Sequence, residues 1–301
     1  MKPVRVWIVL WLAALGLAGC GGGGGDTAPV DPYVASIDAW HAGRVEALRA
    51  ADGWLTLVGL HELGAGPYVV GAGDECDVRL AAGPARLGVL ALDGDTVTFT
   101  AEPGVTVGGA TPDGPAALAD DAAGAPTVIA AGTVSAYVIS RGDRRFLRVK
   151  DSASAARRDF AGVDRYPVDA AWRLTARLET RDMPPTLPVV NVLGQVTQEP
   201  SPGVLIIPWG TRHLRLIPTG DPGGPLFLVF GDATNGDGTY PAGRFLSCDP
   251  PAADGTVIVD FNRAVNPPCA FSPYATCPLP PPENVLPVAV TAGEKTWGAA
   301  H

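Results

Sequence analysis

Several residues and motifs on which enzyme sites commonly depend are scarce or absent in this sequence. It has only 4 histidines in 301 residues, and only His61 and His213 lie centrally in the chain. It has no G-x-S-x-G, H-E-x-x-H or C-x-x-C motif and no glycine-rich phosphate loop between a strand and a helix. A serine triad or a histidine zinc site would therefore have few partners, and we predict neither a metal nor a cofactor.

Basic residues are also in the minority, with 22 Lys and Arg against 31 Asp and Glu and a net charge of −9. A nucleic-acid partner would need a basic face, so we expect no nucleic acid. Glycine (38) and proline (30) are instead abundant, while 47% of the residues are hydrophobic. This composition favours many short strands joined by turns, and we predict a mainly β fold.

Residues 1–20 have the form of an export signal. Lys2 and Arg5 precede an apolar run over residues 6–17, and small residues then lead to Cys20. This pattern resembles a bacterial lipoprotein signal, which is cleaved before the cysteine. The alternative, a short transmembrane anchor, fits less well because the run is brief and stops at cysteine and glycine.

The lipoprotein signal predicts where the protein is and what holds it there. We predict a signal peptide at 1–19 and a flexible glycine-rich tether at 20–30, with Cys20 lipidated and the membrane as its partner. The absence of Asp at position 21 favours the periplasmic face of the outer membrane, by resemblance to other such signals.

Export would place the remaining cysteines, Cys76, Cys248, Cys269 and Cys277, in an oxidising compartment where thiols tend to pair. Four cysteines allow three pairings, which the sequence does not separate. Cys269 and Cys277 are close along the chain, so a possible disulfide between them would close a small loop and contribute roughly 2–3 kcal/mol.

Residues 31–163 are predicted to form an N-terminal helix followed by a β-sandwich. Asp31 and Pro32 are typical of a helix start, and apolar residues then recur at helical spacing to about Ala50. From Gly53 to Lys150, short β runs alternate with glycine, which predicts a sandwich of about a hundred residues. Residues 66–80 faintly resemble the opening of forkhead-associated modules; the phosphothreonine-binding residues of those modules are missing, so the resemblance implies architecture alone.

Residues 141–151 place positive side chains at alternate positions along a predicted strand. The favoured interpretation is a solvated face whose arginines pair with nearby carboxylates. The alternative is a buried Arg148–Asp151 pair near a functional site.

Residues 164–301 are predicted to form a second antiparallel sheet or half-barrel, with one strand at 189–196 and a turn at 183–185. A proline-rich segment, residues 260–295, is predicted to close this domain. Its prolines exclude a helix or a central strand, so we expect it to be an irregular segment. Phe261, Phe271 and Tyr274 supply apolar surface that would anchor it.

Two polar clusters are candidates for a site. The first spans residues 230–246, where Asp232, Asn235 and Asp237 mimic part of a calcium loop that lacks its bidentate Glu. Bonds within their own turn are the commoner role of such residues. Arg244 could form a bidentate pair with Asp232 or with Asp260.

The second cluster leaves a strand and enters the proline-rich segment, where a rigid scaffold could present binding residues. The alternative is that its asparagines pair backbone groups that the prolines leave stranded. The ligand-binding candidates of both clusters are Asp232, Asn235, Tyr240, Arg244, Asp260, Asn262, Arg263, Asn266, Glu283 and Asn284.

The same residues carry a resemblance to a known family. The runs 232–236, 243–246, 260–264 and 266–271, with Glu283-Asn284, resemble the signature of the bacterial family of domain of unknown function 1684. The resemblance covers roughly residues 40–295, although Val265 stands where an aromatic is expected. It implies no activity, and it implies that Cys269 and Cys277 are structural thiols in relatives and a disulfide only here.

Three functions remain open at this point. The leading hypothesis is an envelope lipoprotein that binds a small polar ligand or a partner between the second sheet and the proline-rich segment. A hydrolase could use Asp232, Asp260 or Glu294 as acid or base, with Tyr240 or Arg244 stabilising charge. A structural lipoprotein without a ligand is the third. Charged residues that open into one cavity would favour ligand chemistry, whereas buried and mutually paired ones would favour a sealing role.

Overall fold

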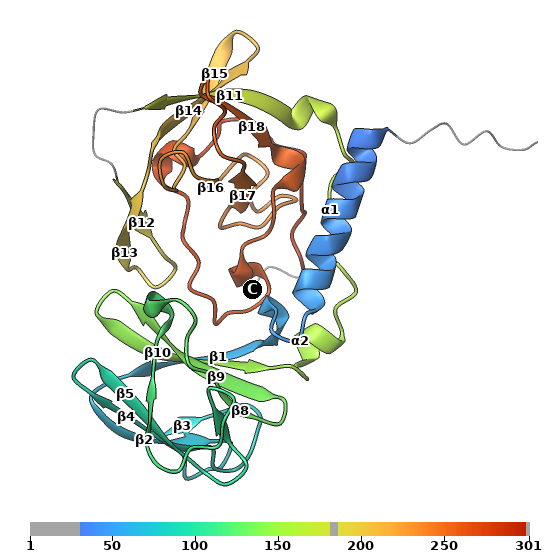
Figure 1. Cartoon of the computed structure of the whole chain (residues 1–301). Coiled ribbons are helices and arrows are strands. Elements are labelled where there is room, and N and C mark those ends of the chain that lie inside the picture. The colour runs from blue at the N-terminus through green and yellow to red at the C-terminus, as the bar shows by residue number, and fades with distance from the viewer. Residues whose placement is uncertain (1–30, 181–185, 299–301) are drawn as a thin grey trace, which may run out of the picture. The chain divides into compact units, whose positions relative to one another are not determined.

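The structure is a computed structural model that describes residues 31–180 and 186–298 (Figure 1). The predicted signal peptide, the lipidation site Cys20, the tether and the turn at 183–185 lie outside the described residues. The division into domains at residue 164 also stays a prediction.

The predicted N-terminal helix is present as α1 (Pro32–Arg49). It buries Ile37 and Leu48, both members of the predicted apolar stripe. Figure 1 shows α1 running alongside the later part of the chain, and Tyr33 and Arg44 of the helix form hydrogen bonds with Asp260 and Glu294. Within the described residues, no helix combines the length and apolar character needed to cross a membrane.

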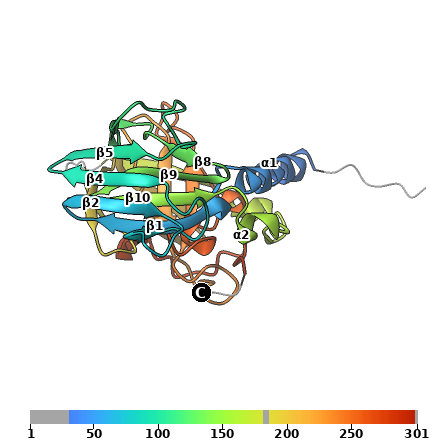
Figure 2. The same cartoon turned by 90° about the horizontal axis from the view of Figure 1, so that it is seen from below.

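The predicted β-sandwich is built from two five-stranded sheets, whose strands overlie one another in Figure 2. One sheet has the order β1 (Leu57–Leu63), β10 (Arg144–Asp151), β9 (Val134–Arg141), β8 (Ile129–Ala131) and β6 (Thr106–Val107). The other has the order β3 (Val78–Arg79), β2 (Gly66–Gly71), β4 (Gly88–Asp93), β5 (Thr96–Ala101) and β7 (Ala116–Leu118). Residues from both sheets, among them Leu90, Phe99, Val138 and Leu147, share one core.

The later residues contain a four-stranded antiparallel sheet and two hairpins. The sheet has the order β15 (Arg212–Leu216), β14 (Gly203–Trp209), β11 (Arg173–Thr180) and β18 (Thr256–Asp260). The hairpins pair β12 (Thr186–Val190) with β13 (Val196–Pro200), and β16 (Leu226–Phe230) with β17 (Arg244–Cys248). The strands do not close into a barrel in the part of the chain that the structure describes.

The single strand predicted at 189–196 is wrong, because the chain reverses direction within it. The Asn191 side-chain oxygen accepts hydrogen bonds from the N–H groups of Leu193 and Gln195, which holds a tight turn between β12 and β13. Gly194, with φ of 75°, supplies the left-handed residue of that turn.

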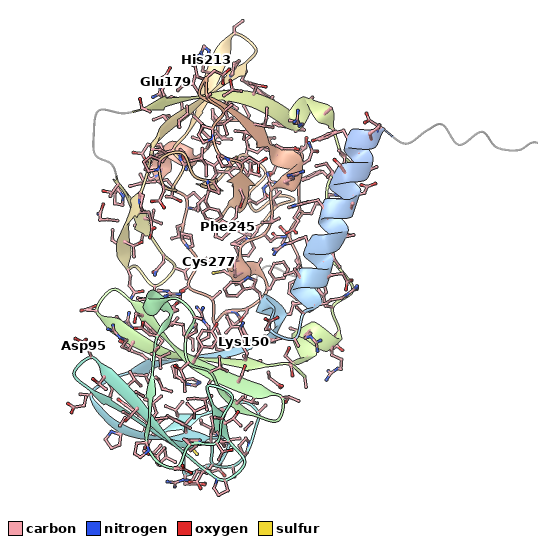
Figure 3. All side chains as sticks on the ribbon, in the orientation of Figure 1. Asp95, Lys150, Glu179, His213, Phe245 and Cys277 are labelled. Carbon is pink, nitrogen blue, oxygen red and sulfur yellow. The ribbon has the colours of Figure 1, made fainter. Side chains whose placement is uncertain are left out.

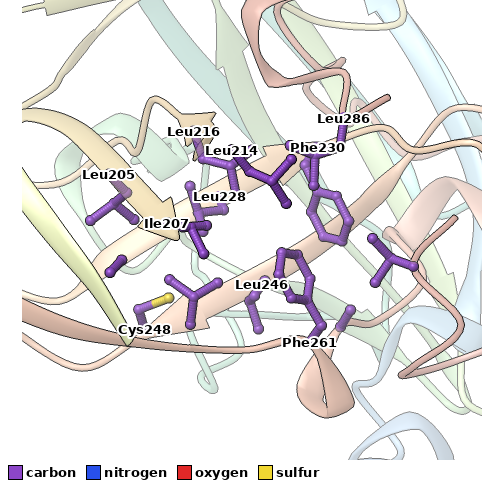
Figure 4. Close-up of a cluster of buried hydrophobic side chains, with 14 of the residues drawn as sticks. Leu205, Ile207, Leu214, Leu216, Leu228, Phe230, Leu246, Cys248, Phe261 and Leu286 are labelled. Carbon is purple, nitrogen blue, oxygen red and sulfur yellow. The ribbon is translucent and has the colours of Figure 1, made fainter. Parts of the chain in front are cut away.

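The core of this second part is shown in Figure 4. Phe261, at the start of the proline-rich segment, packs edge-on against Phe230 with ring centroids 5.3 Å apart. Phe261 and Phe271 are buried, as predicted for anchors, but Tyr274 is 38% exposed, so its predicted anchoring role is wrong. The remaining short elements are α2 (Ala155–Arg158) and the 3₁₀ turns η1 (Trp54–Thr56), η2 (Asp121–Ala123), η3 (Ala170–Trp172), η4 (Phe261–Arg263), η5 (Pro268–Ala270) and η6 (Pro282–Asn284).

The proline-rich segment also lies against the outer face of the first sandwich sheet. Leu147 and Val149 of β10 point into the sandwich core, so Arg148 between them points to the opposite face. There it is covered, at 4% exposure, and donates a hydrogen bond from Nη2 to Thr276 Oγ1 at 3.2 Å.

The predicted solvated face is therefore partly wrong. Arg141 and Arg144 are paired with Asp121 and Glu62, as expected, but Arg148 is buried. The alternative Arg148–Asp151 pair does not form either, because residues three apart in a strand point to opposite faces.

Candidate functional site

Arg244 and Asp232 form a fully buried ion pair beneath the proline-rich segment. Arg244 Nη2 donates to Asp232 Oδ2 at 2.7 Å and to the Val290 carbonyl oxygen at 2.9 Å, while Nη1 donates to the Ala292 carbonyl. Burial lowers the pKa of Arg244, and Asp232 opposes that shift. Of the two predicted partners, Asp232 is the one used, through a single carboxylate oxygen rather than the bidentate form.

The turn that carries Asp232 is bonded to itself. Asp232 Oδ1 accepts from the N–H and the hydroxyl of Thr234 at 2.9 and 2.6 Å, and Asn235 Oδ1 accepts from the Asp232 N–H at 2.5 Å. The Asn235 amide nitrogen donates to Thr239 Oγ1 and to the Tyr240 carbonyl. The side-chain oxygens of Asp232 and Asn235 therefore accept hydrogen bonds from the turn itself, from Arg244 and from the Val290 N–H. No metal-ligating cluster of His, Cys, Asp and Glu occurs among the described residues.

Asp260 and Asn262 bond the proline-rich segment to helix α1. The Tyr33 hydroxyl lies 2.8 and 2.9 Å from the two carboxylate oxygens of Asp260, and Asn262 Nδ2 donates to that hydroxyl at 2.9 Å. Burial and the neighbouring Asp260 raise the pKa of Tyr33 to about 12. Asn262 also exchanges hydrogen bonds with the backbone N–H and carbonyl of Asp169.

Glu294 makes a second bond to the same helix. Arg44 Nε donates to Glu294 Oε1 at 3.2 Å, and the Asn266 N–H donates to Oε2 at 2.6 Å. Burial raises the pKa of Glu294, and Arg44 acts in the opposite direction. Tyr33 and Arg44 were missed by the sequence analysis, because they lie more than two hundred positions from their partners on a helix with no motif of its own.

The remaining candidates are scattered. Asn284 accepts from the Ile217 N–H at 2.7 Å and donates to the carbonyls of Ile217 and Val229, which is the predicted pairing of stranded backbone groups. The Arg263 guanidinium lies 5.9 Å from the Trp40 ring centroid, and its Nε is buried without a partner.

Glu283 is exposed to solvent. Tyr240 is half-buried, and this burial raises the pKa of its hydroxyl. The charged candidates for acid–base chemistry or charge stabilisation are all buried, and none of them lines a cavity described below. They are Asp232, Arg244, Asp260 and Glu294.

A cavity of about 360 Å³ lies elsewhere, between the β12–β13 hairpin, β16, the β9–β10 turn and the proline-rich segment. We call it the hairpin cavity. Its walls are largely apolar, with Leu187, Val189, Ile217, Phe227, Val229 and Leu279. Arg141, Glu199, Thr219, Thr276 and Asn284 add polar groups, and of these only Asn284 was a predicted ligand-binding residue. A further cavity of about 510 Å³ adjoins it at Leu187 and Pro281 and includes Glu283.

A smaller cavity of about 200 Å³ lies where the proline-rich segment meets β10. We call it the arginine pocket; it is lined by Trp54, Arg141, Arg148, Phe245, Pro268, Ala275, Thr276, Cys277 and Pro278. Two of its lining residues, Phe245 and Cys277, are labelled in Figure 3. None of its lining residues was a predicted ligand-binding residue. The sequence did single out Arg148, but only as half of an alternative buried pair with Asp151.

The cysteines are free thiols in the structure, so the predicted Cys269–Cys277 disulfide is not formed there. The two residues are nevertheless adjacent, since the Cys269 N–H donates to Cys277 Sγ at 3.0 Å. The hydrogen bond between the thiols lowers the pKa of Cys269 and, together with burial, raises the pKa of Cys277. Pairing in an oxidising compartment stays a prediction.

Comparison with known proteins gives one family and one structural neighbour to report. Residues 158–295 match the family described as "Protein of unknown function (DUF1684)". No curated protein matches the chain. A solution NMR structure of an uncharacterized protein from Haloarcula marismortui is 30% identical over 46% of this chain and 79% of its own, with a TM-score of 0.39.

Proposed function

Because residues 158–295 match DUF1684, a family whose description names no activity, we propose a function from the site itself. The protein is a lipid-anchored protein of the cell envelope that binds a small organic ligand in the hairpin cavity. The single observation that carries the ligand proposal is a cavity of about 360 Å³ at the junction of the later β strands and the proline-rich segment.

The size and lining of the hairpin cavity support this proposal. Small-molecule sites usually occupy roughly 300–1,000 Å³ and combine mainly apolar walls with a few polar groups that orient the ligand. Leu187, Phe227 and Val229 supply such walls, and Arg141 and Thr276 are among its polar groups. The expected ligand therefore has an apolar body and a polar group, rather than polar groups throughout.

The buried candidate residues fit a different role in the same protein. Asp232 and Arg244 hold the backbone of residues 290 and 292, while Asp260 and Glu294 bond α1. These bonds fix the proline-rich segment that forms part of the cavity wall. General acid or base catalysis needs a carboxyl group within reach of a substrate, and we have no observation that favours it at these closed positions.

Ligand binding is tested by blocking the cavity in the purified full-length protein. Thr219 lines the cavity and is half-buried, so Thr219→Trp should fill part of it. We expect binding of the neutral fluorescent probe Nile red to weaken at least about tenfold, which corresponds to about 1.4 kcal/mol. Thr211→Trp, at an exposed position between β14 and β15, is the matched control and should bind as the unmodified protein does. Equal binding by both variants would show that the probe does not use this cavity.

Lipid anchoring is tested separately with cysteine variants. In cells fed an alkyne analogue of palmitate, the unmodified protein should carry the label and sediment with membranes. Cys20→Ser should lose both properties, because the thioether bond to the diacylglycerol needs the Cys20 sulfur. Cys76→Ser, at a half-buried cysteine far along the chain, should lose neither. Label retained in Cys20→Ser would contradict the anchor.

A further inference from the structure

Arg148 is a buried cation without an acidic partner among residues 31–180 and 186–298. The only hydrogen bond of its guanidinium to a described residue is the one from Nη2 to Thr276 Oγ1, and its Nε is buried without an acceptor. The Trp54 ring lies 5.8 Å from the guanidinium carbon, an attraction worth roughly 0.5–2 kcal/mol. Burying an ion costs several kcal/mol, so this attraction alone does not offset the cost.

Thr276 is arranged to donate a hydrogen bond in the same place. Its hydroxyl oxygen accepts from Arg141 Nε at 3.1 Å and from Arg148 Nη2 at 3.2 Å. A hydroxyl has two acceptor positions and one proton, so both acceptor positions are used and the proton remains to be donated. Arg148, Arg141 and Thr276 all line the arginine pocket and all present donors to it.

The neighbouring acids do not neutralise Arg148. Asp121 pairs with Arg141 at 2.7 Å, which leaves that arginine with little net charge to offer. Asp151 accepts from the Ala153 N–H and points to the other face of β10. Cys269 is an acidic group nearby that does not line the pocket, and its pKa is lowered chiefly by the hydrogen bond with Cys277, with a smaller effect of Arg148.

The arginine pocket also adjoins the hairpin cavity. Arg141, Thr276 and Pro278 line both, so the pocket lies beside the larger, mainly apolar space. A ligand with its apolar body in the hairpin cavity could reach the arginines with one end. Because a single cation is uncompensated, the complementary group carries one negative charge, as a carboxylate does; a phosphate monoester would carry about −1.5 to −2.

We infer that Arg148, with Arg141 and Thr276, binds the carboxylate of an amphipathic organic acid whose apolar body occupies the hairpin cavity. This inference rests on the proposed ligand-binding function and specifies its ligand class. The carboxylate accepts charge-assisted hydrogen bonds from the guanidinium of Arg148 and a hydrogen bond from the Thr276 hydroxyl. The ligand carboxylate thereby supplies the counter-charge that Arg148 lacks among the described residues.

The experiment compares octanoate with 1-octanol, which shares the apolar chain but carries no charge, by calorimetric titration of the purified full-length protein. We expect octanoate to bind at least about tenfold more tightly than 1-octanol. Arg148→Gln should remove that preference by weakening octanoate binding. Arg212→Gln, at an exposed arginine with no ion pair to another described residue, is the matched control and should retain it. Thr276→Val, which keeps the side-chain shape, should weaken octanoate binding by several-fold.

The outcomes separate this inference from the function on which it rests. If both probes bind equally to the unmodified protein, or if Arg148→Gln retains the preference for octanoate, the carboxylate site is overturned while the cavity function stands. If neither probe binds, both are overturned. Thermal unfolding of each variant shows whether it is folded, and Thr276→Val provides an independent reading if Arg148→Gln is not.

Discussion

Arg244 and Arg148 are both buried arginines on strands, but their surroundings differ in the partners that they provide. Arg244 has the carboxylate of Asp232 and two backbone carbonyls as acceptors. Arg148 has one hydroxyl acceptor and an aromatic ring. Burial alone therefore does not identify a functional cation. The informative property is whether the protein itself satisfies the charge, because an unsatisfied buried charge is costly unless something binds it.

The two arginines also differ in what they face. Arg244 is sealed beneath the proline-rich segment and lines none of the cavities described above, whereas Arg148 lines a pocket that shares three lining residues with a larger cavity. The residues that look most like a catalytic set in the sequence are thus the ones most fully used to hold the fold. The site that remains available is assembled mainly from residues that were not candidates for ligand binding, with Asn284 as the exception.

The largest effect is expected from Arg244→Gln. The substitution leaves the Asp232 carboxylate buried without its cation and removes donors from the carbonyls of Val290 and Ala292. Breaking a buried pair by removing one partner typically costs about 3–5 kcal/mol, and we expect a loss of that size in the free energy of unfolding measured by urea denaturation.

Asp237→Asn is a control for charge changes near this pair, because Asp237 is exposed in the same turn as Asp232. It should change the free energy of unfolding by no more than about 0.5 kcal/mol. If Arg244→Gln lowers the free energy of unfolding no more than Asp237→Asn does, the Arg244–Asp232 pair does not stabilise the fold. The proposed difference between Arg244 and Arg148 would then be wrong.

Glu294 provides an intermediate case, a buried acid whose partner Arg44 offsets only part of the cost of burial. Its pKa is raised by burial above the ordinary value of 4.5. A group whose folded-state pKa is raised contributes stability that is present below its unfolded pKa and is lost as the pH rises through the folded value. We expect the free energy of unfolding to carry a descending contribution above pH 4.5 that Glu294→Gln removes.

The measurement is a series of urea denaturations across that pH range. Glu283→Gln, at an exposed position in the same segment, is the control and should keep the pH dependence of the unmodified protein. If the stability of Glu294→Gln depends on pH as that of the unmodified protein does, burial does not raise the pKa of Glu294 in the folded protein.

Local features of the fold could be predicted from the sequence, whereas long-range contacts could not. The helix at Pro32–Arg49 and the hairpin turns near Gly94 and Gly142 follow from spacing and from glycine, which act within a few residues. The reversal at Asn191 was missed because its side-chain bonds to the backbone interrupt an apolar run that reads as continuous.

The candidate site shows the same limit more sharply. The pairing of Arg244 with Asp232 lies within one hairpin and was foreseen, but Tyr33 and Thr276 acquire their roles only when distant segments meet. The alternation of β10 correctly placed Arg148 on the outer face of the sandwich. It could not show that residues more than a hundred positions later cover that face.

Of the substitutions at buried charged residues, Arg148→Gln is expected to lower the free energy of unfolding least, in contrast to Arg244→Gln. Removing this cation strands no buried carboxylate among the described residues, and the glutamine amide can still donate to Thr276. Replacing a buried charge is often neutral or stabilising, so the free energy of unfolding without ligand should change by less than about 1 kcal/mol or rise. In saturating octanoate the unmodified protein should become the more stable of the two, because a ligand that binds the folded state stabilises most the protein that binds it most tightly. A loss as large as that at Arg244→Gln in the absence of ligand would mean that the fold itself satisfies Arg148, and the distinction between a structural and a ligand-binding arginine would fail at this position.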